Sequence, residues 1–185
     1  MAHRLRGTLD SLTDEEGRSL RPIGMSVREA ADRTGALLHP VADHPGVRLY
    51  AGVRVAEGAP RIGFAVSTVS HLLLVESVAW PSGSYTVAAD GCVLCDGTYI
   101  GQSVHPLLGS VRLLRRLVRR LVVGAVVVVH PSGSGSPSLP PRSPGGILWL
   151  PPSTVRSHLS RRLLLRGRDI SCQHDTNSWY RQLHR

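Results

Sequence analysis

Lysine is absent from the sequence, and all 22 basic residues are arginines. A P-loop needs a lysine to contact the phosphates of a nucleotide, and a Schiff-base enzyme uses a lysine amine as its nucleophile. Arginine replaces neither, because its guanidinium group stays protonated. A GC-rich coding sequence is a sufficient cause of this bias, and whatever the cause, the absence of lysine excludes these two classes of protein.

Cysteines, aromatic residues and long apolar runs are also scarce. The 3 cysteines leave one unpaired and do not make a disulfide framework. The longest apolar run, Leu121 to Val129, is about half as long as a membrane-spanning helix. Met1 to Glu16 lacks the apolar segment of a secretory signal. With 185 residues, of which 42% are hydrophobic, we expect one globular, cytoplasmic domain without a membrane span.

The formal net charge of +9 is concentrated in two segments. Residues 107–121 contain five arginines and no acid, and residues 155–185 contain seven arginines against two aspartates. Each segment therefore carries +5, and the rest of the chain is almost neutral at −1. These two segments either contact phosphate groups or face water.

Composition and periodicity divide the chain into three parts. Residues 1–25 are polar and have no period, which predicts a loose leader. Residues 26–166 predict one α/β domain, in which the Ser-, Pro- and Gly-rich residues 131–146 form a mobile loop without a packing signal. Residues 167–185 again lack a period and predict an irregular basic tail.

Hydrophobic spacing predicts the elements of the central domain. Residues 26–38 have the period of a helix, which Ser26 caps and His39-Pro40 ends. The apolar stretch 71–80 predicts a strand buried on both faces, and 103–121 has the spacing of an amphipathic helix. The other expected elements are strands over 47–55, 61–68, 122–130 and 147–150, a hairpin of 84–89 with 92–95 about Asp90-Gly91, and a helix over 154–165. The central order αβββαβ predicts a mixed sheet flanked by helices.

Cysteine and histidine do not form a metal-binding pattern. Cys92 and Cys95 lie on an expected strand, where their side chains point to opposite faces. The motif occurs once, whereas a tetrahedral site needs two further ligands. We therefore expect small apolar packing and no metal there, and we place His71 and His130 at strand edges or in loops.

An acid inside the buried strand, within the order αβββαβ, resembles the restriction-endonuclease-like superfamily. Residues 47–130 are most similar to its nuclease-related domain (NERD) family, on the strands 47–55 and 61–68, the stretch VESVAWPSGSY and the helix start HPLLGSVRLLRRL. In this family the central strand ends with an acid, any residue and a lysine, followed by an aromatic residue and a glycine turn. Glu76, Trp80 and Gly83 stand at the acid, aromatic and glycine positions.

The resemblance implies a divalent metal held by two carboxylates and a main-chain carbonyl, with a lysine beside them. Glu76 matches one acid, but Val78 stands at the lysine position and Gly63 at the position of the second acid. We therefore expect a catalytically inactive site that needs no cofactor. Glu76 is then a vestigial metal ligand or a buried acid paired with an arginine.

An active Mg²⁺-dependent nuclease with relocated ligands is the alternative. Asp90 and Asp96 are then the candidates for the second acid, although Asp90 lies at an expected hairpin tip. Arg61 and Gln102 are the candidates for the missing lysine, Gln102 at the start of the long helix.

The arginines of the long helix are the strongest binding signal. Arg112, Arg115, Arg116 and Arg119 recur at helical spacing opposite the apolar face. Such a row can follow the phosphates of DNA or RNA and makes binding dependent on salt, whereas an aromatic content of 4% does not indicate stacking on single strands. A protein partner, or a solvated face on a plain structural domain, fits the same residues.

Overall fold

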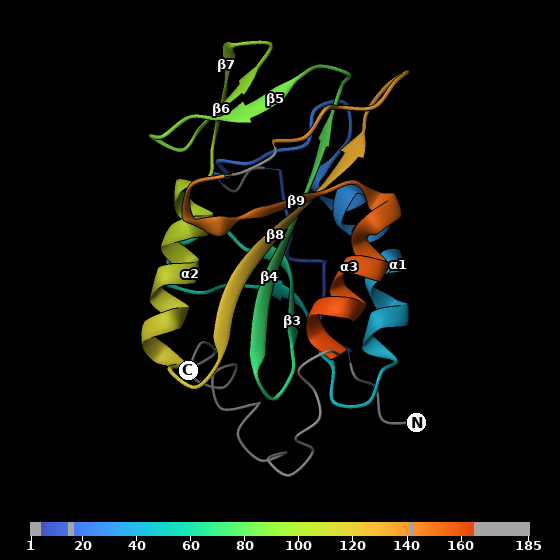
Figure 1. Cartoon of the computed structure of the whole chain (residues 1–185), viewed down its shortest axis with the longest axis vertical. Helices are drawn as coiled ribbons and strands as arrows, with labels where there is room; N and C mark the ends of the chain where they lie inside the picture. Colours follow the sequence, from blue (N-terminus) through green and yellow to red (C-terminus); the bar gives the residue numbers. More distant parts are fainter. Residues whose placement is uncertain (1–4, 15–16, 141–142, 165–185) are drawn as a thin grey trace.

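A computed structural model describes residues 5–14, 17–140 and 143–164 (Figure 1). Its main feature is a 6-stranded mixed sheet with the strand order β1-β2-β3-β4-β8-β9. The strands are β1 (Leu5–Gly7), β2 (Arg48–Val53), β3 (Ile62–Ser67), β4 (His71–Trp80), β8 (Val122–Pro131) and β9 (Leu148–Leu150). The prediction of a mixed sheet is confirmed, and the expected tail 167–185 lies outside the described residues.

The centre of the sheet is the parallel pair of β4 and β8, which is in register from His71 opposite Val122 to Trp80 opposite Pro131. Every residue of β4 is buried, as the continuous apolar stretch predicts for a strand covered on both faces. On the other side of β4, the strands β2 and β3 complete an antiparallel meander.

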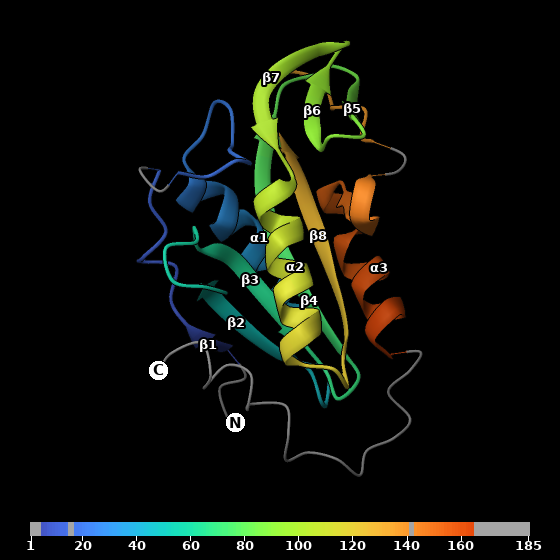
Figure 2. The same cartoon turned by 90° about the vertical axis from the view of Figure 1, so that its left-hand side faces the viewer.

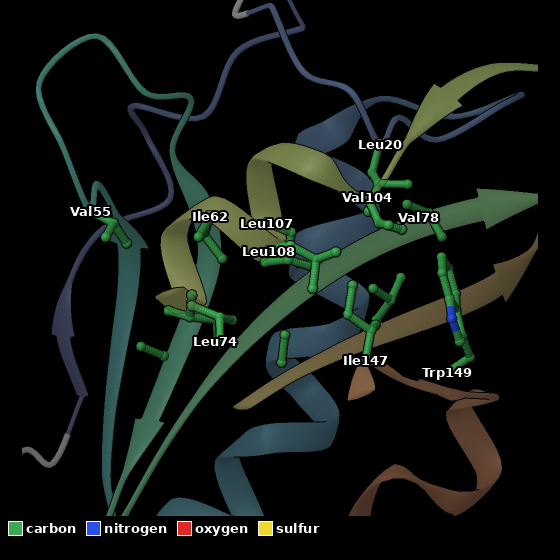
Figure 3. Close-up of a cluster of buried hydrophobic side chains, with 14 of the residues drawn as sticks. Leu20, Val55, Ile62, Leu74, Val78, Val104, Leu107, Leu108, Ile147 and Trp149 are labelled. Carbon is green, nitrogen blue, oxygen red and sulfur yellow. The ribbon is translucent and has the colours of Figure 1, made fainter. Parts of the chain in front are cut away.

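Helices cover both faces of the sheet. The helices α1 (Val27–Ala42) and α3 (Pro152–Leu164) lie together on one face, and α2 (His105–Leu117) lies on the other (Figure 1). The α1-side core includes Leu38, Leu49, Phe64, Val75, Val126 and Leu159. The α2-side core includes Leu20, Ile62, Leu74, Val78, Leu107 and Trp149 (Figure 3). Among the described residues, no helix is long and apolar enough to cross a membrane.

The helix α1 extends beyond its expected end. Ser26 caps it as predicted, because its side chain accepts a hydrogen bond from the Glu29 amide at 3.1 Å. Pro40, however, lies inside the last turn instead of ending the helix. A proline there removes only one hydrogen bond, and the next two residues, Val41 and Ala42, bury apolar side chains against the sheet.

The helix α2 ends earlier than its apolar period suggests, at Leu117 instead of at residue 121. Val118 has φ −117° and ψ 63°, which is not helical. The chain then makes a turn, in which the Leu121 amide donates to the Val118 carbonyl at 3.0 Å, and enters β8. The helical period continues into this turn by chance, so periodicity alone overestimates the helix.

A separate 3-stranded antiparallel sheet stands at one end of the molecule (Figure 2). It consists of β5 (Tyr85–Val87), β6 (Cys92–Cys95) and β7 (Thr98–Ser103), of which β7 was not expected. The expected hairpin of β5 and β6 is confirmed, and Asp90-Gly91 lies in its turn, although the Ala88 amide donates to the Cys92 carbonyl so that the loop has three residues and not two. The two-residue turn Asp96-Gly97, with φ of 50° and 79°, joins β6 to β7. Both residues have the positive φ that a type I′ hairpin turn requires. The ring of Trp80 stacks on Tyr85 at 4.3 Å and ties this sheet to β4.

Residues 5–14 and 17–25 are not the loose leader that their polarity predicts. The strand β1 pairs with β2 in parallel, Leu12 is buried in the α1-side core, and Leu20 is buried in the α2-side core (Figure 3). The segment therefore crosses from one face of the sheet to the other. Isolated apolar residues without a period are enough to dock it, which is why the sequence gives no sign of this packing.

The Ser-, Pro- and Gly-rich segment after β8 also packs more than predicted. Ser138 forms a bridge with Ser84 beside the small sheet, and Leu139 packs against the α2-side core. The 3-10 helix η1 (Pro144–Gly146) then leads to β9. Backbone hydrogen bonds hold this segment, and side-chain composition does not reveal them.

Candidate functional site

Glu76 is a buried acid in the middle of β4, with 8% of its surface exposed. One oxygen, Oε1, accepts a hydrogen bond from the Ser77 amide at 3.1 Å. The other, Oε2, lies 3.6 Å from Nη1 of Arg18, whose side chain is 2% exposed. Of the two interpretations of Glu76 that the sequence leaves open, the geometry matches a buried acid paired with an arginine.

Gly63 on β3 lies near the carboxylate of Glu76. The paired register of β3 with β4 ends at Phe64 opposite Val75, and Gly63 and Glu76 are the next residues beyond that pair. A methyl group on Gly63 would lie 3.8 Å from Oε1 of Glu76. A carboxylate at residue 63 would therefore share a site with Glu76, but this chain has a glycine there.

Val78 is the second departure from the expected catalytic set. It follows Glu76 by two residues on the same strand, so both side chains face α2. Val78 is fully buried among apolar side chains of the α2-side core (Figure 3). Its surroundings have no place for the charge that a lysine would bring.

A small cavity of about 50 Å³ adjoins the ion pair. Arg18 and Glu76 line it together with the hydroxyl-bearing Ser19, Ser103 and Ser110, and α2 closes one side. The volume is sufficient for a few water molecules and too small for a nucleotide. Apolar residues, among them Leu20, Ile62 and Leu107, complete the lining, so the cavity is a small, largely apolar pocket beside a paired carboxylate.

Neither of the candidates for a relocated acid lines this cavity. Asp96 is exposed in the turn between β6 and β7, and its Oδ1 accepts a hydrogen bond from the Ser84 amide at 2.9 Å. Asp90 lies at the other turn of the small sheet, where the backbone amide of Cys92 donates to its carboxylate and lowers its pKa. Both acids stabilise hairpin backbone, which explains why aspartates occur at these positions.

The candidates for the missing lysine also have other roles. Gln102 is buried, and its side-chain amide accepts from the Arg21 amide at 3.2 Å and donates to the Arg21 carbonyl at 3.1 Å. It thus fixes the N-terminal segment to β7. Arg61 donates to the Gly52 carbonyl at 2.9 Å. Neither side chain lines the cavity beside Glu76.

The set of ionisable groups around Glu76 limits what the site can do. In residues 5–14, 17–140 and 143–164, no three His, Cys, Asp or Glu side chains come together as metal ligands would. A single carboxylate that already faces a guanidinium group offers a cation little net negative charge. The site can hold a carboxylate and a cationic side chain together, and it can order water between them.

The arginines of α2 do not form the continuous row that the sequence predicts. Arg112 and Arg116 are exposed on the helix. The guanidinium group of Arg115 instead turns back, and its Nε and Nη2 donate to the Val123 carbonyl at 3.1 and 3.0 Å. Arg119 lies beyond the end of α2, in the turn that leads to β8. Arg115 is therefore part of the helix–strand connection, and Arg119 lies in the turn after the helix instead of on it.

Carboxylates are absent from a long part of the chain around these arginines. No aspartate or glutamate occurs between Asp96 and Asp169. The elements α2, β8, β9 and α3 all fall in this interval. The exposed arginines on α2 and α3 consequently have no acid on their own elements to balance them.

Sequence reasoning missed a buried polar chain on the opposite face of the sheet. Ser77 donates to the Thr34 hydroxyl at 2.8 Å, and this hydroxyl lies 2.8 Å from Nε2 of His130. Burial, and to a lesser degree the charge of Arg33, lower the pKa of His130. His130 and His71 are both buried within strands and not at edges or in loops. The polar side chains Thr34 and Ser77 at buried positions were the available signal.

Arg18 was missed as well, because it lies in the segment that sequence composition assigns to the leader.

Comparison with models of protein families, with curated proteins and with solved structures gives no match to this chain. Function is therefore inferred from the pairing of Glu76 and from the distribution of arginine.

Proposed function

We propose that the chain is a nuclease-related domain of restriction-endonuclease-like architecture that has lost hydrolytic activity and binds nucleic acid. The order of α1, β2, β3, β4, α2 and β8 supports the proposal, because it is the αβββαβ order of that superfamily. Further support comes from the place of Glu76 on β4, near the residue at which a second acid would stand.

The observation that carries the loss of activity is the ion pair of Arg18 with Glu76. Metal-dependent hydrolysis needs carboxylates that attract a divalent cation and lower the pKa of its bound water. Here a guanidinium group faces the carboxylate, Gly63 supplies no second acid, and Val78 supplies no cation for the developing charge.

The observation that favours nucleic acid is the exposed arginine surface of α2 in a part of the chain without acids. Arginine binds phosphate through its planar fork of donors. Each phosphate contact releases condensed counterions, so that affinity falls steeply as salt rises.

Duplex binding tests the proposal by fluorescence anisotropy at about 50 mM and about 200 mM salt. The double variant Arg112→Gln/Arg116→Gln is compared with Arg156→Gln/Arg161→Gln, which removes the same charge from the exposed surface of α3 on the other face. We expect the α2 variant to bind more weakly and to lower the slope of log affinity against log salt by about 2. Equal effects of the two variants would contradict a site on α2, and no binding of the wild type at low salt would exclude nucleic-acid binding.

The loss of activity has its own test. The wild type is incubated with single- and double-stranded DNA in the presence of Mg²⁺ or Mn²⁺, and we expect no cleavage. Cleavage that disappears in Glu76→Gln would overturn the inactive assignment and favour the Mg²⁺-dependent alternative.

A further inference from the structure

The turn between α2 and β8 exposes apolar side chains among arginines. Leu117 and Val122, at its two ends, are 47% and 46% exposed and are among the large apolar residues that the described structure leaves open to solvent. Arg116, Arg119 and Arg120 lie within two positions of one or the other in the chain and are exposed. We call residues 116–122 the arginine turn.

Backbone hydrogen bonds hold the arginine turn in one shape. The Val118 amide donates to the Leu114 carbonyl at 2.8 Å, and the Leu121 amide donates to the Val118 carbonyl at 3.0 Å. Arg119 and Arg120 therefore occupy the two central positions of a β-turn. The Val122 amide donates to the Ser70 carbonyl at 2.8 Å, which fixes the end of the turn to the main sheet.

We propose that the arginine turn enters the minor groove of duplex DNA and favours A·T-rich sequence. This inference rests on the proposed function: it specifies A·T-rich duplex DNA as the ligand and the arginine turn as the element that contacts its minor groove. The minor groove, about 6 Å wide, excludes a helix but admits a narrow turn. Its narrow A·T-rich stretches carry enhanced negative potential that attracts arginine, and aliphatic side chains serve there as wedges against sugars and base steps.

The arginines of α2 extend the same surface towards the phosphates. Arg112 and Arg116 are one helical turn apart, and α2 runs directly into the arginine turn. At 1.5 Å per residue, Arg112 lies roughly 6 Å along the axis from Arg116, so the two side chains can contact different phosphates of one strand. With the turn in the groove, these two side chains can contact the backbone that borders it.

Other ligands fit these observations less well. Stacking on single strands needs exposed aromatic residues near the basic surface, but the exposed Tyr99 lies on β7, at the opposite end of the molecule from the end of α2 (Figure 2). An anionic membrane needs a broad apolar face to insert, and the apolar face of α2 is buried in the α2-side core.

Two duplexes of equal length, one A·T-rich and one G·C-rich, test the inference with the full chain. We expect the wild type to bind the A·T-rich duplex on the order of tenfold more tightly. A polyamide that fills the A·T minor groove should compete with the protein for this duplex. The variant Leu117→Ala/Val122→Ala should lose most of the preference and keep its salt slope, whereas Leu5→Ala/Ile23→Ala, which trims exposed aliphatic residues elsewhere, should keep both.

The outcomes separate the two proposals. Salt-dependent binding with equal affinity for both duplexes and no competition by the polyamide would overturn the minor-groove inference and leave the proposed function standing. No binding to either duplex would overturn both. Retention on vesicles of phosphatidylserine and phosphatidylcholine, without duplex binding, would assign the arginine turn to a lipid surface instead and would also overturn both.

Discussion

At the scale of single residues, the buried charges are the most informative feature. Arg18 and Glu76 have side chains that are 2% and 11% exposed, so that each would be a costly buried charge without the other. Removing one partner of such a pair is strongly destabilising, whereas replacing both can be nearly neutral. The pair thus makes the N-terminal segment and β4 depend on each other.

A double-mutant cycle tests this dependence. We expect Glu76→Gln and Arg18→Gln each to lower the free energy of unfolding by about 3–5 kcal/mol. The double variant should lose less than the sum, with a coupling energy on the order of 1–3 kcal/mol, measured by urea unfolding. The exposed pair of Arg28 and Asp10, 2.7 Å apart, is the control and should couple more weakly. Strict additivity at Arg18 and Glu76 would contradict the pairing.

His130 predicts how stability depends on pH. Its pKa is lowered in the folded protein, mainly by burial and further by Arg33, so the unfolded chain takes up a proton at a higher pH than the folded chain does. The contribution of His130 to the free energy of unfolding is therefore fully present above the unfolded pKa of about 6.5 and is lost as the pH falls below it. Urea unfolding between about pH 8 and pH 5 measures this loss around the unfolded value.

The variant His130→Gln places a neutral amide at the position of Nε2 and should flatten the acid part of the profile. It should not abolish the slope, because burial also lowers the pKa of His158, so that this side chain acts with the same sign. A profile identical to that of the wild type would show that His130 does not titrate in this way.

At the scale of helices and strands, local patterns predict most elements but misplace several ends. The strand β4 and the start of α1 agree with expectation because burial and a Ser cap are local signals. The end of α2 does not, because the hydrogen bonds of Arg115 to Val123 involve two elements at once. The strand β7 was missed because most of its side chains are not buried, which leaves no apolar alternation to detect.

The candidate site shows the same contrast between residues with a local sequence signal and residues placed by contacts between distant segments. Glu76, Gly63 and Val78 could be singled out in the sequence because they lie on two adjacent strands whose apolar patterns are local signals, while their role stays a prediction. Arg18 could not, because its partner is far away in the sequence and its neighbours have no periodic pattern. Contacts between distant segments decide such positions, and a single sequence does not contain them.

The docking of β1 on β2 gives a prediction at this scale. Gly52 has φ +62°, and a Cβ there would collide with the Thr8 carbonyl. Gly52→Ala should destabilise the protein by about 1–3 kcal/mol and increase amide exchange in β1. Gly46→Ala is the control, since Gly46 also has a positive φ, +80°, but nothing lies within 4 Å of its Cβ position. An equal loss of stability in both variants would mean that strain alone, and not the contact with Thr8, is responsible.

At the scale of the whole molecule, acidic and basic residues are segregated along the chain. Acids cluster before residue 97, and the elements from α2 to α3 contain arginine without acids. The sequence alone locates this division, but it does not locate the arginines in space. The fold places α2 and α3 on opposite faces of the sheet (Figure 1), so a flat polyanion can engage only one of the two basic helices at a time.

The path of residues 5–14 and 17–25 across the sheet has a consequence for how the chain assembles. This segment precedes all of its partners in the chain, which lie at β2, at Glu76 and at Gln102, 81 positions beyond Arg21. Such long loops must close before the contacts form, and a high contact order slows folding. The segment is therefore made before everything that it packs against, and both cores stay incomplete until it docks.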